Sequence, residues 1–167
     1  MKTKDPGFSL IELLIVVVII GIIAAIAIPG FLASRRSANE GSAISMMRML
    51  HGAQMAYFTT YGNGEFAGDV GAGTAAGLNT LHARGLVDNV VGGGIKSGYN
   101  FVVGREASTS ASPALFFFSA IPISADSLVG TGNRRFGIVT DGVMRGDNNL
   151  TSHYTDVANA SSAPALN

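Results

Sequence analysis

Cysteine and tryptophan are both absent from this chain of 167 residues, and charged side chains make up only 13% of it. Without cysteine there is no disulfide framework and no thiolate chemistry. Lysine and arginine together equal aspartate and glutamate in number, so no basic excess points to nucleic acid. If the protein is exported, its fold must hold without covalent cross-links.

Sequence motifs of common enzymes are also missing. No serine stands in a Gly-x-Ser-x-Gly context. The glycine-rich stretch GAGTAAG, residues 71–77, lacks the lysine of a phosphate-binding loop. His51, His82 and His153 are too far apart to have metal-ligand spacing. The sequence therefore predicts neither an enzyme nor a resident cofactor.

A long apolar run near the N-terminus is the main feature of the sequence. Leu13–Ile28 is wholly apolar, and the segment that begins at Phe8 has 21 residues. A helix of that length can cross a hydrocarbon core of about 30 Å. Lys2 and Lys4 precede it, which places the N-terminus in the cytoplasm by the positive-inside rule. We therefore expect a transmembrane helix here.

A single carboxylate, Glu12, interrupts this segment near its start. A charge at the centre of a bilayer costs about 2.5–3.5 kcal/mol on insertion scales, so ionisable residues in such segments are functional by default. A cleavable secretory signal is an alternative, because residues 25–27 are similar to a small-x-small cleavage site. The run is longer than a signal h-region, however, and signal peptides lack an internal carboxylate.

The helical pattern continues beyond this segment, after an interruption. Gly21, Pro29 and Gly30 are predicted to weaken or break the helix. From Phe31 to Phe58 the pattern is amphipathic, with one face available for a core. That face contains Ile44, Met47, Leu50, Ala53, Gln54, Tyr57 and Phe58, whereas Arg35, Arg36, Glu40 and Arg48 are predicted to lie mostly off it.

The rest of the chain predicts a small sheet, and the fold class is α+β. Residues 60–97 form a glycine-rich loop with a short helix within 75–87. Strands are predicted at 99–103, 114–123 and 135–140, with a short fourth strand in the sheet region 98–146. The tail comprises residues 147–167, and its small, polar part from Ser152 onward is expected to be loosely ordered. We expect residues 31–59 to pack against one face of an antiparallel sheet.

The segment Gly7–Phe31 resembles the N-terminus of type IV pilins and of the related pseudopilins of type II secretion. In this resemblance Gly7 is the last leader residue, Phe8 the first mature residue and Glu12 the fifth. Pro29, with the Gly and Phe that follow it, also matches. Residues 92–103 and 134–145 are similar to the sheet of cysteine-free bacterial pilins. The Asp-Pro-Trp-Gly element of the major pseudopilin is absent, which favours a pilus pilin.

The resemblance implies a structural role in a filament. A prepilin peptidase would cut between Gly7 and Phe8 and methylate the Phe8 amine. An assembly ATPase and an inner-membrane platform would then add the subunit to a homopolymer at the cell surface, or in the periplasm for a pseudopilus. The implied divisions are a leader (1–7), a membrane and filament-core helix (8–30) and a globular domain (31–167). A type II secretion pseudopilin and a membrane-anchored periplasmic domain that never polymerises are the alternatives.

Asp141, Asp147 and Asp156 are candidate calcium ligands, because some pseudopilins bind calcium in a C-terminal loop. Carboxylate oxygens suit calcium, but the spacing here fits no EF-hand. The sequences around Asp141 and Asp147 are ordinary turn sequences. The prediction is therefore that no metal is bound.

Overall fold

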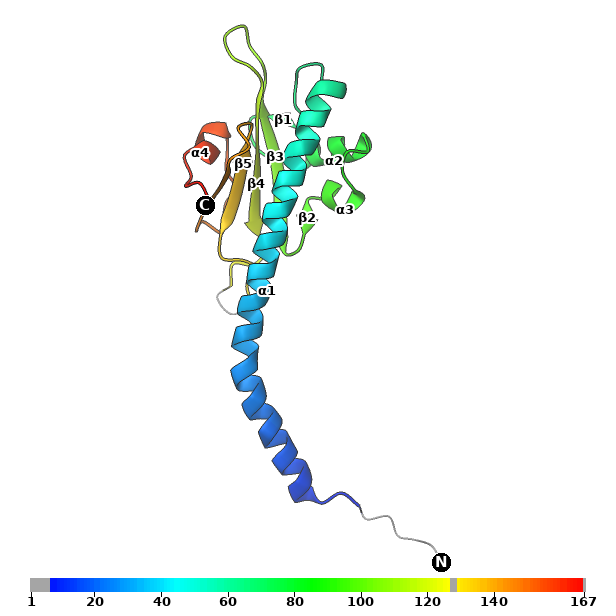
Figure 1. Ribbon diagram of the computed structural model, residues 1–167, viewed down its shortest axis with the longest axis vertical. Helices are drawn as coiled ribbons and strands as arrows, with labels where there is room; N and C mark the ends of the chain where they lie inside the picture. The colour runs from blue at the N-terminus through cyan, green and yellow to red at the C-terminus, as the bar shows by residue number, and fades with distance from the viewer. Residues whose placement is uncertain (1–6, 127–128, 167) are drawn as a thin grey trace, which may run out of the picture. The chain divides into compact units, whose positions relative to one another are not determined.

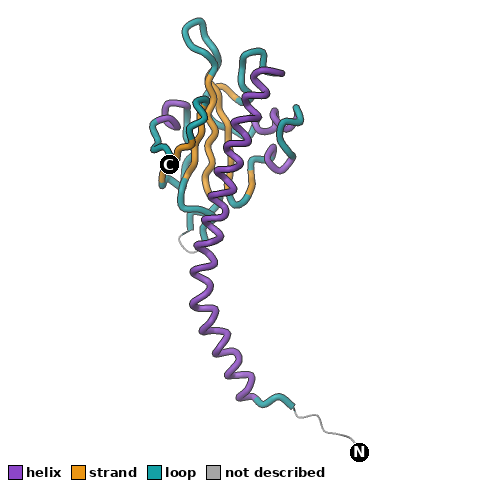
Figure 2. Tube along the Cα trace, viewed as in Figure 1, coloured by secondary structure: helices purple, strands orange, loops and turns teal. Residues whose placement is uncertain are grey.

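The computed structural model describes residues 7–126 and 129–166, and it confirms an α+β fold. The chain divides into two compact units, Met1–Ser34 and Arg35–Asn167. The boundary lies four residues after the predicted division between 30 and 31. Helix α1, Leu10–Thr60, is continuous and contains residues of both units (Figures 1 and 2).

The α1 residues of the first unit are apolar and exposed, from Leu10 to Phe31 with few exceptions. By length and composition this helix can cross a membrane. Pro29 has no N–H to donate, so the carbonyl four residues earlier lacks its usual helical donor. The helix nevertheless continues through Gly21, Pro29 and Gly30 in the single subunit. A break in an assembled fibre stays a prediction.

The α1 residues of the second unit bury one face. Its buried residues are Glu40, Ala43, Met46, Met47, Leu50, Ala53 and Gln54. Ile44, Tyr57 and Phe58 are partly buried and pack against the same core. This confirms the predicted apolar stripe of the amphipathic half.

The prediction that Glu40 lies off the buried face was wrong, because Glu40 is buried. Its carboxylate accepts the backbone N–H of Asn133 at 2.8 Å and pairs with the Arg134 guanidinium at 2.9 Å. A buried charge is tolerated when it is paired and hydrogen-bonded in this way. Hydrophobic periodicity assigns charges to the solvent face and cannot anticipate a partner 94 residues away.

The sheet is mixed rather than purely antiparallel, which corrects the sequence prediction. Its strand order is β1-β3-β4-β5-β6, and β2 also pairs with β3. The strands are β1 Asp69–Val70, β2 Ile95–Lys96, β3 Tyr99–Glu106, β4 Leu115–Pro122, β5 Arg135–Val139 and β6 Met144–Asp147. Only the β1–β3 pair is parallel among the named strands. Strands of two residues, such as β1 and β2, are too short to show an alternating pattern, so the sequence did not predict them.

One face of the sheet forms the main core with α1. Alternating residues from β3 to β6 supply Tyr99, Phe101, Val103, Phe116, Phe118, Ala120, Phe136, Ile138 and Met144. These side chains belong to the same buried cluster as Met47 and Leu50 of α1. The amphipathic half of α1 is therefore the partner of this apolar face, as predicted.

The opposite face of the sheet is covered by the tail, so the prediction that the tail is loosely ordered was wrong. Phe117 and Val139 form a second buried cluster with Tyr154, Val157 and Ala160. The last two belong to helix α4, Val157–Ser161. These three apolar tail residues span only seven positions, too few for a clear periodic signal, yet they are enough to cover a strip of the sheet.

The connection between β1 and β3 contains helices α2, Ala76–Ala83, and α3, Asn89–Gly92. The first confirms the short helix predicted within 75–87, with Leu78 and Leu81 buried. Gly85 follows it with a φ of 70°, a left-handed conformation that favours glycine after a helix. Two parallel strands need a crossover of this kind, and β1 and β3 are joined by it.

A chain that begins at Ser34 should be a soluble monomer with an intact fold. The exposed apolar half of α1 is then removed, whereas the buried face of α1 and both faces of the sheet remain complete. Size-exclusion chromatography and circular dichroism of this fragment check the prediction. Persistent aggregation, with the sheet unfolded, would contradict it.

Candidate functional site

The predicted processing bond lies just before α1. Gly7, Phe8 and Ser9 are exposed and precede the helix, which begins at Leu10. The Phe8 side chain is 82% exposed. The Gly7–Phe8 peptide bond is therefore outside regular structure, and no other described segment of the subunit covers it.

The Glu12 carboxylate closes the first turn of α1. It accepts the backbone N–H of Ser9 at 2.9 Å, and the Ser9 carbonyl accepts the N–H of Leu13 at 3.3 Å. Ser9 is thus the N-cap residue and Glu12 the third helical residue, as in one half of a capping box. A carboxylate here also favours the helix dipole, by about 0.3–1 kcal/mol.

The capping role of Ser9 was not among the sequence predictions. The signal was present, because Ser-x-x-Glu before an apolar run is the sequence signature of a capping box. Glu12 therefore has a local structural role besides the assembly role predicted for it. The two roles make different demands on the side chain, since a cap needs an oxygen acceptor and a charge partner needs a negative charge.

Comparison with known proteins places this N-terminal segment in a family. Residues 2–28 match the Prokaryotic N-terminal methylation motif. A 69-residue stretch is 41% identical to the Type IV major pilin protein PilA of Myxococcus xanthus, covering 41% of this chain and 31% of that protein. The N-terminal segment is therefore similar to that of type IV pilins. Pilins are structural proteins, not enzymes.

Two other relatives of this chain are also filament proteins by name. It is 34% identical over 92 residues to the Fimbrial protein EcpC of Eikenella corrodens, covering 55% of this chain and 60% of that protein. It is 62% identical over 34 residues to the Type IV wide pilus major component PilA4 of Thermus thermophilus, covering 20% of this chain and 26% of that protein. The chain spans between 26% and 60% of the length of these three relatives. No solved structure matches it significantly.

The three candidate calcium ligands are engaged with protein groups instead of facing one another. Asp141 pairs with Arg145 and Asp147 with Arg135, each at 2.6 Å. The Asp156 carboxylate accepts the backbone N–H of Asn159 and caps α4. In residues 7–126 and 129–166, no group of three or more metal-binding side chains lies together.

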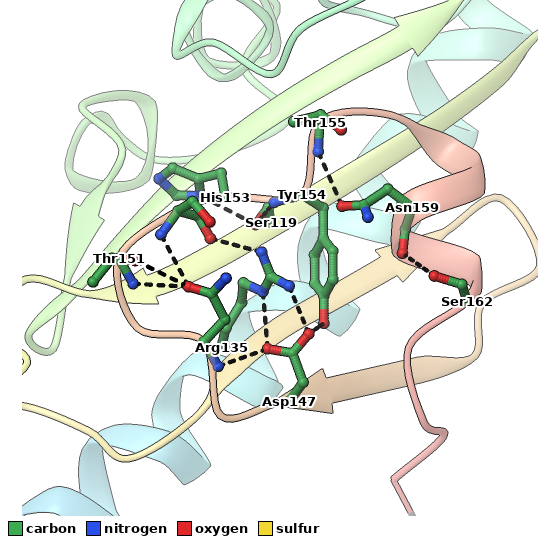
Figure 3. Close-up of polar contacts among 11 residues, drawn as sticks. Ser119, Arg135, Asp147, Thr151, His153, Tyr154, Thr155, Asn159 and Ser162 are labelled. Atoms are coloured by element: carbon green, nitrogen blue, oxygen red, sulfur yellow. Dashed lines mark hydrogen bonds and ion pairs between the residues drawn. The ribbon is translucent and has the colours of Figure 1, made fainter.

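Arg135 and Asp147 instead belong to a polar network that holds the tail on the sheet (Figure 3). The buried Arg135 guanidinium donates two hydrogen bonds to Asp147 and one to the Ser152 carbonyl. Its central carbon also lies 3.8 Å from the centre of the Tyr154 ring. Burial alone raises the pKa of Asp147, but the hydrogen bonds from Arg135 and Asn149 outweigh it and hold the pKa below its usual value.

Two further contacts join the tail to β4. The Ser119 hydroxyl accepts the backbone N–H of Tyr154 at 3.0 Å and lies 3.1 Å from Nδ1 of His153. The Tyr154 hydroxyl donates to Asp147, and burial, with the nearby Asp147 charge, raises the tyrosine pKa to about 12. Burial and, secondarily, the Arg135 charge lower the pKa of His153 to about 4. The fold therefore favours neutral His153.

Acid should weaken the fold between about pH 6.5 and pH 4, partly through His153. The native pKa lies below the ordinary value of 6.5, so the unfolded chain binds a proton first and stability falls as pH decreases through this window. In the fragment beginning at Ser34, His153→Asn should reduce that loss by about 1–2 kcal/mol, a figure reduced for partial exposure. Urea unfolding as a function of pH checks this. Equal losses in both proteins would contradict it.

Proposed function

We propose that this protein is the structural subunit of a type IV pilus-like filament. The observation that carries the proposal is the methylation-motif match over residues 2–28, with Glu12 at the start of an exposed apolar helix. In the proposal, residues 1–7 are a leader that a prepilin peptidase removes, and Phe8 becomes the methylated N-terminus. Residues 8–30 then hold the subunit in the inner membrane before assembly.

Polymerisation would bury the exposed half of α1. The side chains of Leu10, Ile11, Leu13 and Leu14 are each at least 52% exposed in the single subunit. Bundled helices in a filament core remove such apolar surface from water or lipid and complete their packing. An assembly ATPase and an inner-membrane platform would move the subunit from the membrane to the growing fibre. The globular unit would face outward, at the cell surface.

The Glu12 carboxylate is proposed to pair with the Phe8 ammonium in the fibre. Cleavage after Gly7 creates that positive charge one residue before the N-cap. A buried ammonium or carboxylate is costly unless it is paired. The bond from Ser9 uses one acceptor position of Glu12, and a carboxylate offers about four. The remaining positions can accept the Phe8 amine of the same subunit or of a neighbour.

This pairing would define the axial stagger between subunits. A displaced neighbour would leave one charge unpaired in an apolar core, which costs about 3–5 kcal/mol for a buried pair with one partner removed. The correct stagger is then the one in which every Phe8 amine meets a carboxylate. Apolar packing alone discriminates weakly between staggers along Leu13–Ile28, because the side chains along this run are so alike.

The native subunit should begin at Phe8 and carry one methyl group. Loss of two lysines and one aspartate with the leader changes the formal net charge from 0 to −1. Mass spectrometry of fibres sheared from cells checks this. An N-terminus at Ile28 would support the signal-peptide alternative, and an uncut chain without fibres would support a non-polymerising membrane-anchored domain.

Substitutions of Glu12 should separate capping from charge pairing. Glu12→Gln keeps an oxygen that can accept the Ser9 N–H but removes the charge, whereas Glu12→Leu removes both. Under the pairing proposal both variants are cleaved normally, and both lose more than about tenfold in fibre number, given the cost of an unpaired buried charge. Electron microscopy of cells that lack the native subunit provides the count.

The outcome for Glu12→Gln decides between the two roles. Wild-type fibre numbers in Glu12→Gln, with few fibres in Glu12→Leu, would mean that Glu12 acts only as a helix cap. Normal fibres in both variants would contradict any assembly role. Ser9→Ala is a matched control, because it leaves the backbone N–H and the Glu12 charge in place.

Residues 21–29 should lose helical hydrogen bonds in the fibre. Gly21 and Gly30 have low helix propensity, and Pro29 lacks a donor, so this is the part of α1 that costs least to extend. The extended segment would let the fibre stretch while subunit contacts on both sides persist. A filament reconstruction checks this, and continuous helix through these residues would contradict it.

A further inference from the structure

The turn that follows α1 contains the only Asn-Gly pair in the sequence, Asn63-Gly64. The Glu65 N–H donates to the Gly62 carbonyl at 2.9 Å, so Asn63 and Gly64 are the two central residues of a β-turn. Their φ angles are 48° and 89°, both positive, as in the type I′ turn that Asn-Gly favours. Both residues are exposed.

The reactive groups of this turn are free. Within the described residues, neither the Asn63 side chain nor the Gly64 amide has a hydrogen-bond partner. A Cβ built on Gly64 would meet no atom within 4 Å. The ends of the turn are held, by contrast, because Gly62 donates to the Tyr57 carbonyl and the Glu65 carboxylate accepts from Ser108 and Arg105.

The geometry points to Asn63 as a site of spontaneous conversion to aspartate and isoaspartate, with water as the co-reactant. The Gly64 nitrogen attacks Cγ of Asn63 and forms a five-membered imide. The bond from Cγ to Nδ2 breaks, and the amide leaves as ammonia with the proton lost from the Gly64 nitrogen. Water then opens the ring at one of its two carbonyls, which gives aspartate or isoaspartate. No oxidant or reductant takes part.

Other sites in the chain show what restrains this reaction. Asn39, Asn133 and Asn159 use their side chains in hydrogen bonds, and each is followed by a residue with a Cβ, which hinders attack by its backbone nitrogen. Asp141-Gly142 has the favourable glycine, but its carboxylate is bound by Arg145 and by the Val143 N–H. Asn63 combines an unbound side chain with a following glycine.

The conversion adds one negative charge to a subunit whose formal charge is close to zero. The new carboxylate lies two residues from Glu65, and isoaspartate also lengthens the backbone of the turn. This inference does not depend on the proposed function. In a long-lived fibre, however, the modified fraction would record the age of the subunit.

The test is to incubate the full-length chain in detergent at neutral and mildly alkaline pH and to follow it by isoelectric focusing and peptide mass mapping. A species with one more negative charge should accumulate, map to residue 63 and form faster at the higher pH. Asn63→Gln and Gly64→Ala should each slow its formation by about tenfold or more. Because Gly64→Ala introduces strain at a positive φ, circular dichroism confirms that each variant is folded.

Asn148 is the internal control, because it is exposed but is followed by Asn149 instead of glycine. Conversion at Asn148 as fast as at Asn63 would overturn the inference. So would a charge variant that forms equally fast in Asn63→Gln, or no charge variant at either pH.

Discussion

The packing of α1 against one face of the sheet is the contact on which the globular unit depends. Met47 and Leu50 are fully buried, and they share a cluster with aromatic side chains from β3, β4 and β5. No cysteine is available to strengthen this contact, so buried apolar area supplies the main stabilisation. The crossover through α2 and α3 adds Leu78, Leu81 and Val91 to the same cluster, whereas the tail packs on the far face of the sheet.

Three parts of the fold could be predicted because their signals are local. The first part of α1 is an unbroken apolar run, its continuation has a helical hydrophobic period, and the long strands are short apolar runs between turn sequences. β1, β2 and α4 could not be predicted, since they are only two to five residues long. Glu40 was misplaced for a different reason, because its burial depends on an arginine and a backbone N–H far along the chain.

The N-terminal site could also be predicted only in part from the sequence. Glu12 was recognisable as exceptional because a charge in an apolar helix needs an explanation. Its bond to Ser9 is also recognisable from the sequence, because it depends on a four-residue pattern, Ser-x-x-Glu. Glu12 and Glu40 are both acidic residues of α1 that accept a backbone N–H. Glu12 accepts it at the start of the helix, and Glu40 accepts it from the loop before β5.

The network around Arg135 also determines the chemical conditions under which the fold can form. It closes the C-terminal region with an ion pair, a stacked tyrosine ring and hydrogen bonds to Ser119, all of them reversible. Folding therefore needs no oxidant and no disulfide isomerase. The contacts that hold residues 152–166 on the sheet are non-covalent, so a reducing environment leaves them in place.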